Sequence, residues 1–241
     1  MITPSHHIPD LTDPRYLNEI GWFINHEKDL YSGSGMSYTD ARIANSHMQL
    51  QEFFEISGKD EAWMVNQTVV TIGPGCTGDL SAWPAGRKIS VDPLLIVYQR
   101  LGMLIGDVAG AEAVWVVAAA ESLPLIDACA DLVYCRNALD HIMNPVSAVS
   151  EISRILKPDG LFYVDVDLGG IPTPDEPMVF TSVTLQELIA PHFRTRSQRD
   201  RSIPHSKNSH TRRELLLEHY PGCELPRMEK AALLSQYLQQ F

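Results

Sequence analysis

The middle of the chain alternates short apolar runs with amphipathic stretches. Apolar and β-branched residues fill positions 69–72, 88–91, 113–117, 131–135 and 161–166. Runs of this length predict buried strands. Helical candidates lie between them, at roughly 78–83, 94–105 and 145–156, and the last stops at Lys157-Pro158-Asp159-Gly160. This alternation predicts an α/β fold: a doubly wound, Rossmann-like, mostly parallel sheet with helices on both faces.

The two ends of the chain do not show this alternation of apolar runs and amphipathic stretches. Residues 1–62 are polar and aromatic, with one helix expected from Asp40 to Phe54, and we expect them to form an N-terminal helical lid segment. Residues 63–241 are expected to form the Rossmann-like domain. Two late runs, Phe193–Ile203 and Arg213–His219, bring the predicted sheet to seven strands, with a turn-rich segment between them. An amphipathic helix is expected over Arg227–Gln240.

Charge and cysteine content narrow the function classes. Lys and Arg total 19 against 30 Asp and Glu, a formal net charge of −11, whereas nucleic acids and anionic membranes are bound by basic surfaces. We therefore expect no nucleic-acid and no membrane partner. Four cysteines without a C-x-x-C pair, nine histidines without metal spacing, and a start without a signal peptide favour a cytoplasmic protein with no metal site.

A glycine-rich loop follows the first predicted strand. Gly73-Pro74-Gly75-Cys76-Thr77-Gly78 fits G-x-G-x-x-G, which lets the backbone turn sharply and approach an adenosine-containing ligand. Asp92 closes the second strand, where a carboxylate can accept hydrogen bonds from ribose hydroxyls. A structural turn, with Asp92 as the N-cap of a helix starting at Pro93, explains the same residues. The pattern suits a nicotinamide dinucleotide and S-adenosylmethionine equally.

Later segments resemble one family of cofactor-binding proteins. They are 120–125, 130–141, 144–145 and 151–160, and with the glycine loop they resemble the class I S-adenosylmethionine-dependent methyltransferases, most of all the small-molecule branch called methyltransferase type 11. The resemblance covers roughly residues 66–167. It implies S-adenosyl-L-methionine as cofactor and S-adenosyl-L-homocysteine as product. The residues it implies for the cofactor site are Gly73, Pro74, Gly75, Gly78, Asp92, Pro93, Ala120, Glu121 and Asn137, with Tyr38 of the N-terminal segment closing over them.

Three positions depart from that family. Thr71 stands where the family usually has an acid that organises the methionine end of the cofactor, and Ala119 where it often has Asp. The third glycine of the family's loop falls on Thr77, with Gly78 one step later. A catalytically silent binding or partner subunit on the same scaffold therefore stays open. A nicotinamide-dependent oxidoreductase is a second alternative, although no Tyr-x-x-x-Lys pair follows the fourth predicted strand.

His141 and Asp167 are the candidate catalytic residues. His141 follows the fourth strand at the carboxyl edge of the sheet, and its pKa range suits a general base, although a packing role explains it as well. Asp165 and Asp167 end the fifth strand at the same edge and can orient an acceptor hydroxyl or amine. We predict methyl transfer to a small-molecule acceptor of a biosynthetic pathway. A homodimer is compatible with this prediction.

Overall fold

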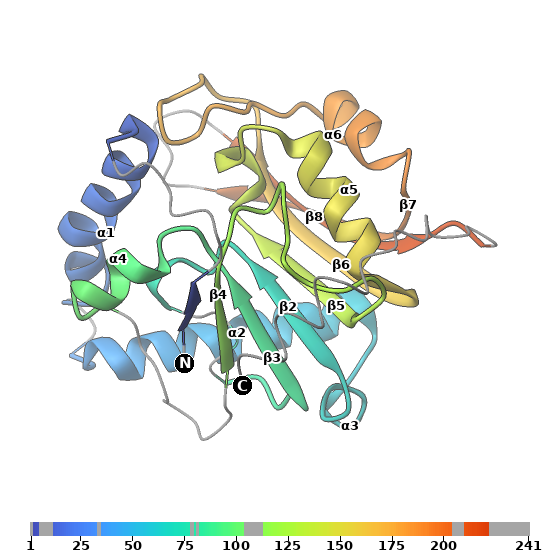
Figure 1. Ribbon diagram of the computed structural model, residues 1–241, viewed down its shortest axis with the longest axis horizontal. Coiled ribbons are helices and arrows are strands. Elements are labelled where there is room, and N and C mark those ends of the chain that lie inside the picture. The colour runs from blue at the N-terminus through green and yellow to red at the C-terminus, as the bar shows by residue number, and fades with distance from the viewer. Residues whose placement is uncertain are drawn as a thin grey trace.

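The computed structural model describes residues 2–4, 12–32, 35–77, 80, 82–103, 113–203 and 210–221, and it contains an eight-stranded sheet (Figure 1). The strands are β1 (Ile2–Pro4), β2 (Thr68–Ile72), β3 (Arg87–Val91), β4 (Ala113–Val117), β5 (Ala130–Arg136), β6 (Leu156–Leu168), β7 (Phe193–Ile203) and β8 (His210–His219). Their order in the sheet is β1-β4-β3-β2-β5-β6-β8-β7. The first six in this order pair in parallel, and β8 pairs antiparallel with both β6 and β7.

All seven predicted strands are present, and β1 adds a short eighth at the edge beside β4. The helix expected over 145–156 ends at Ile155, and β6 begins at Leu156, five residues before the predicted fifth strand. Leu156 has extended backbone, with φ −74 and ψ 135, and pairs with Ala130. The next pair is Leu161 with Leu132, so the residues between Leu156 and Leu161 form a bulge inside one long strand.

Helices lie on both sides of the sheet. They are α1 (Pro14–Ser32), α2 (Tyr38–Ser57), α3 (Glu61–Met64), α4 (Leu95–Arg100), α5 (Pro145–Ile155) and α6 (Ser182–Ile189), with short 3-10 turns η1 (Gly75–Thr77) and η2 (Leu139–His141). The predicted helices at 40–54 and 145–156 are confirmed as α2 and α5, and α4 is shorter than expected. The structure gives no helix to residues 80, 82 and 83. The predicted helix at 227–240 lies outside the described residues.

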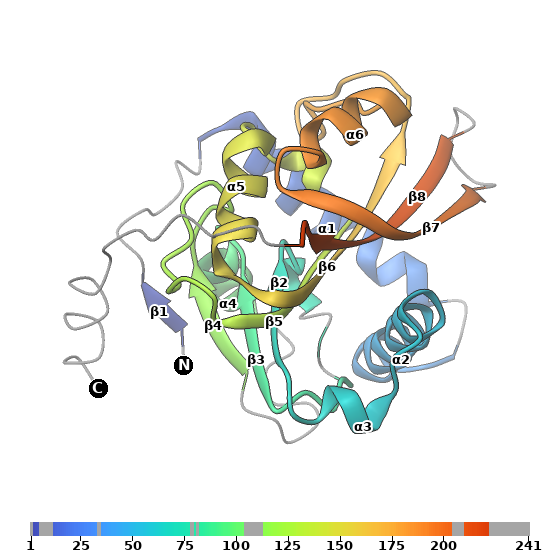
Figure 2. The ribbon, with the colours of Figure 1, turned by 90° about the vertical axis from the view of Figure 1, so that its right-hand side faces the viewer.

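Helices α5 and α6 lie on one face of the sheet and α2 on the other (Figure 2). Each face has its own hydrophobic core. One core packs α5 and α6 against the sheet, with Val133 and Ile152 fully buried. The other packs α2, through Phe53, against Trp83 at a ring-centroid distance of 5.6 Å. Because α2 completes the second core, only α1, in the N-terminal segment, is free to cover the carboxyl edge of the sheet.

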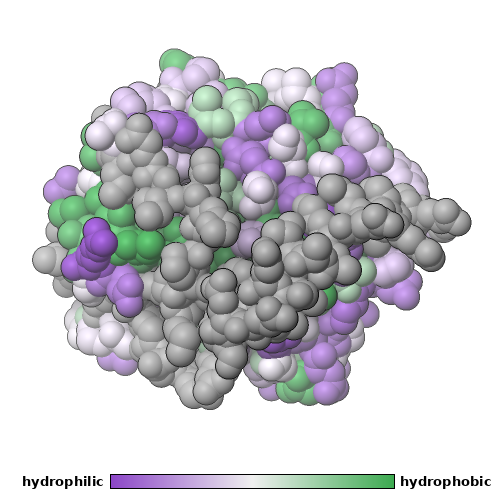
Figure 3. Space-filling view, viewed as in Figure 1, coloured by the Kyte–Doolittle hydropathy of each residue, from purple (hydrophilic) through white to green (hydrophobic). Residues whose placement is uncertain are grey.

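The outer surface is mostly polar in the view of Figure 3, with an apolar area on the side where α1 and α4 lie. Leu17 and Trp22 of α1 and Leu101 after α4 are exposed apolar residues. Among the described helices, none combines the length and the apolar character that a membrane span requires.

Candidate functional site

A cavity opens at the carboxyl edge of the parallel strands. Its walls come from the residues that follow β2, β3, β4 and β5, and from α1, which contributes Arg15, Tyr16 and Glu19. The space between these walls is about 740 Å³, including the opening to solvent. The carboxyl edge of an open α/β sheet is where ligands bind in this class of fold.

The glycine loop turns at the bottom of this cavity. Gly73 has a φ of 64°, a conformation that glycine adopts at little cost, and a Cβ there would lie 2.6 Å from the Cβ of Ala138. Gly75 has a φ of 62°, and a Cβ there would lie 2.7 Å from the ring of Phe23 on α1. Gly73 lines the cavity, whereas the space beside Gly75 is filled by Phe23. The second glycine therefore serves the contact with α1.

Asp92 fixes the shape of that loop and faces the cavity. Its Oδ2 accepts a hydrogen bond from the Gly75 N–H at 3.1 Å, and its Oδ1 accepts one from the Leu94 N–H at 2.8 Å. The residue is only 6% exposed, yet it lines the cavity together with Pro93. Because α4 begins at Leu95 and Leu94 is its N-cap, the expected capping role of Asp92 is wrong. A carboxylate held by two backbone donors still has lone pairs for a ligand hydroxyl.

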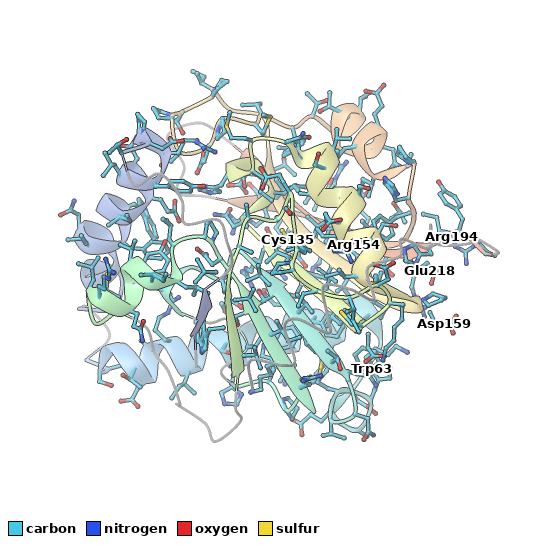
Figure 4. All side chains as sticks on the ribbon, viewed as in Figure 1. Trp63, Cys135, Arg154, Asp159, Arg194 and Glu218 are labelled. Carbon is cyan, nitrogen blue, oxygen red and sulfur yellow. The ribbon has the colours of Figure 1, made fainter. Side chains whose placement is uncertain are left out.

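The loop after β4 brings Ala120 and Glu121 to the cavity wall. Arg154 of α5 holds this loop from behind (Figure 4), and it is 4% exposed. Its guanidinium donates to the carbonyl oxygens of Leu123 at 2.9 Å and Leu125 at 2.7 Å. It also donates to Glu151, at 2.8 and 2.7 Å, and to Asp127, at 2.7 Å. Sequence reasoning missed this role, although the spacing of Glu151 and Arg154 on a helix signals an ion pair.

Asn137 follows β5 and lines the cavity in a left-handed conformation, with φ 47°. Its N–H donates to the Asp165 carbonyl oxygen at 2.8 Å, and its Oδ1 accepts a hydrogen bond from Arg212 of β8 at 2.8 Å. Arg212 also donates to Asp167 at 2.8 Å. Asp167 is not among the cavity-lining residues, so the structure does not bring the two predicted catalytic residues together there.

His141, in η2, lies on the cavity wall among carboxylates. Its Nδ1 is 3.4 Å from Glu19 Oε2, and its Nε2 is 4.0 Å from Asp140 Oδ1. Burial raises the pKa of Glu19 to about 7, and burial likewise raises the pKa of Asp140 to about 6. Sequence reasoning missed Glu19 because α1 was not predicted.

Four predicted residues are not placed at the cavity by the part of the chain that the structure describes. Pro74 and Gly75 are buried in the loop and do not line the cavity. Tyr38 is the first residue of α2, the helix that packs into the second core. Gly78 lies outside the described residues.

Comparison with known proteins agrees with this geometry. Residues 72–164 match the family model described as "Methyltransferase domain". A comparison with curated protein sequences finds no match.

Solved structures with the same fold are distant in sequence. A protein from Methanosarcina mazei described as a SAM-dependent methyltransferase is 16% identical, with a TM-score of 0.52 over 64% of this chain and 92% of that chain. Geranyl diphosphate C-methyltransferase from Streptomyces coelicolor, in complex with Mg2+, a substrate analogue and S-adenosyl-L-homocysteine, is 12% identical, with a TM-score of 0.55 over 72% and 76%. The [4+2]-cyclase SpnF is 14% identical, with a TM-score of 0.54 over 77% and 84%.

Proposed function

We propose that this chain, which carries a methyltransferase domain over residues 72–164, transfers a methyl group from S-adenosylmethionine to a small-molecule acceptor. The observation that carries the proposal is the convergence of Gly73, Asp92 and Ala120 on one cavity, each following a different parallel strand. A glycine turn and a carboxylate at this edge of the sheet are what an adenosine-containing ligand uses in this class of fold, which supports the proposal.

The residues present suit the cofactor. Asp92 would hold the ribose hydroxyls, Pro93, Ala120 and Glu121 would surround the adenine, and Gly73 leaves the open space that a side chain would fill. Asn137 would face the methionine part. When bound, the cofactor supplies an electrophilic methyl group on a positively charged sulfur. The protein's share of the work is to align the acceptor and exclude water.

We propose that His141 acts at the acceptor side of the cavity and promotes loss of the acceptor's proton. It lines the cavity wall next to Asn137, and each of its ring nitrogens has a carboxylate oxygen nearby, 3.4 Å away on Glu19 and 4.0 Å away on Asp140. We propose no direct contact between Asp167 and the acceptor. Because it pairs with Arg212, and Arg212 holds Asn137, we assign it a positioning role.

The acceptor that we propose is a small molecule of a biosynthetic pathway, handled in the cytoplasm. The net charge of −11 counts against nucleic acid as the substrate, and the geranyl diphosphate enzyme with the same fold acts on a small molecule. The alternative is a catalytically inactive binding or partner subunit with the same fold, which the departures at Thr71 and Ala119 favour. SpnF has this fold and is named as a [4+2]-cyclase. The fold alone therefore does not decide between an active methyltransferase and an inactive subunit.

Calorimetric titration with S-adenosyl-L-homocysteine tests the proposal. The wild-type chain is expected to bind one molecule, and Asp92→Asn to weaken binding roughly 10- to 100-fold, since hydrogen bonds to a charged group contribute about 1.5–3 kcal/mol. Asp159→Asn, at an exposed position in the β6 bulge, is the control and should bind as wild type does. Undetectable binding at millimolar ligand contradicts the proposal.

A further inference from the structure

Three metal-ligand side chains converge behind the acceptor side of the cavity. Asp140 and His141 come from η2, and Glu176 comes from the loop before α6. One ligand atom of each lies within 4.8 Å of the other two. The loop is anchored in place, since the Met178 N–H donates to the Asp140 carbonyl oxygen at 3.1 Å and the Glu176 N–H donates to Thr173 Oγ1 at 3.0 Å. Hydrogen bonds from the backbone therefore hold the loop that carries Glu176 close to η2.

Asp140 supplies an independent sign that a ligand belongs there. The residue is 4% exposed, and its Oδ1 accepts no hydrogen bond from any part of the chain that the structure describes. The same Oδ1 faces His141 Nε2 at 4.0 Å. A buried carboxylate oxygen without a donor is costly, so such groups are paired or coordinate metals.

The second ring nitrogen of His141, Nδ1, also lies near a carboxylate. His141 Nδ1 lies 3.4 Å from Glu19 Oε2, on a helix that packs over the cavity. A proton on Nδ1 directed to this carboxylate leaves the lone pair of Nε2 facing Asp140. In metal sites, a histidine ligand usually donates its second N–H to a carboxylate or carbonyl in this way.

We propose that Asp140, His141 and Glu176 bind a divalent cation of the Mn²⁺ or Zn²⁺ type at the wall of the cavity. Mixed imidazole and carboxylate ligands suit these ions. Two carboxylates and a neutral imidazole balance a double positive charge. Metal–ligand bonds of about 2.0–2.2 Å place ligand atoms roughly 3–3.6 Å apart, so the group must close by about 1 Å. Glu176 is exposed and is the side chain that can move.

The proposed cation changes what His141 does for an acceptor. With three protein ligands, the cation keeps open positions, which an acceptor oxygen can occupy where His141 meets the cavity. A bound cation lowers the pKa of a coordinated hydroxyl. His141 then acts as a ligand of the cation, and the acceptor's proton passes to water at the open side of the cavity. The site departs from the expectation, drawn from the sequence, that the chain holds no metal.

Titration of the metal-free protein with Mn²⁺, followed by electron paramagnetic resonance of the free ion, tests the site without any cofactor. One Mn²⁺ per chain is expected. Glu176→Gln and Asp140→Asn should each weaken binding at least 10-fold, and Glu19→Gln should weaken it less. Glu187→Gln, an exposed acid on α6, is the matched control and should leave binding unchanged.

Two outcomes overturn the site: no binding at millimolar Mn²⁺, or binding of equal strength in Glu176→Gln. Since Glu176 is exposed, this variant keeps the test valid where Asp140→Asn fails to fold. The titration with S-adenosyl-L-homocysteine described above is performed without metal. Mn²⁺ binding without cofactor binding supports the metal site and contradicts the proposed function, and the reverse result does the opposite.

Discussion

At the scale of single residues, the cavity depends on side chains that hold its loops in place. Asp92 shapes the glycine loop through two backbone N–H groups, and Arg154 holds the loop after β4 through two carbonyl oxygens. The sequence predicted Asp92 because a strand end and a glycine motif define its position. It did not predict Arg154 or Glu19, because their partners are distant in sequence or lie on an unpredicted helix. A local pattern carries no information about such contacts.

Replacing Arg154 by Lys should reveal how much this anchor stabilises the protein. A lysine keeps the charge but cannot donate to two carbonyls and two carboxylates at once. We expect the free energy of unfolding to fall by about 3 kcal/mol, as for other broken buried ion pairs. Urea denaturation measures the change.

Arg194→Lys is the control for that experiment. Arg194 is 50% exposed, and its Nη2 lies 2.6 Å from Glu218 Oε1 (Figure 4). An exposed pair of this kind contributes about 0–1 kcal/mol. An equal loss in the two variants contradicts the anchoring role of Arg154.

At the scale of elements, the N-terminal segment divides into two helices with different surroundings. Helix α2 buries Leu50 and Phe53 in the second core, whereas α1 reaches the cavity with Tyr16 and Glu19. Phe23 of α1 packs edge-on against Tyr98 of α4, at a centroid distance of 5.4 Å. The lid that the sequence suggested for residues 1–62 is, in our proposal, α1 alone.

Hydrogen exchange with and without S-adenosyl-L-homocysteine separates these two helices. Ligand binding stabilises the elements that contact the ligand, by up to about 2.7 kcal/mol or roughly 100-fold in exchange at 100 times Kd. We expect slower exchange of amides in α1 and little change in α2, which serves as the internal control. Unchanged exchange in α1, at saturating ligand, contradicts its role as a lid.

At the scale of the whole molecule, the strands were predictable and several connections were not. Buried runs such as Thr68–Ile72 and Ala130–Arg136 read clearly because parallel strands are apolar on both faces. The bulge in β6 was not predicted, because Pro158 and Gly160 are residue types that are typical of turns and not of strands. The ion pairs that join α2, β6, β7 and β8 also escaped. Arg201, for example, pairs with Glu52 and Glu214 at 2.5 Å each.

Asp165 makes this network sensitive to pH. Its side chain is 1% exposed, 3.3 Å from Arg212 and 3.5 Å from Arg136, and neither carboxylate oxygen accepts a hydrogen bond from the described residues. Burial raises its pKa from 3.8 to about 6. The folded protein therefore binds more protons than the unfolded chain between about pH 4 and pH 6, and the contribution of Asp165 to stability falls as the pH rises through this window.

Asp165→Asn removes that dependence. Relative to wild type, the variant should gain stability as the pH rises from 4 to 7, by roughly 3 kcal/mol for a shift of about two pKa units. Urea denaturation at several pH values, with Asp159→Asn as the exposed control, measures the difference. Parallel curves for wild type and Asp165→Asn contradict the assignment.

The position of β8 has a consequence for the order in which the protein is made. Residues 210–219 form an interior strand, placed between β6 and β7, although they come last in sequence among the strands that the structure describes. On the ribosome, β6 keeps an open edge until β8 has emerged, and Asn137 lacks its Arg212 partner until then. Because Arg212 holds Asn137 at the cavity wall, we expect the cavity to reach its final arrangement only after this strand has been made.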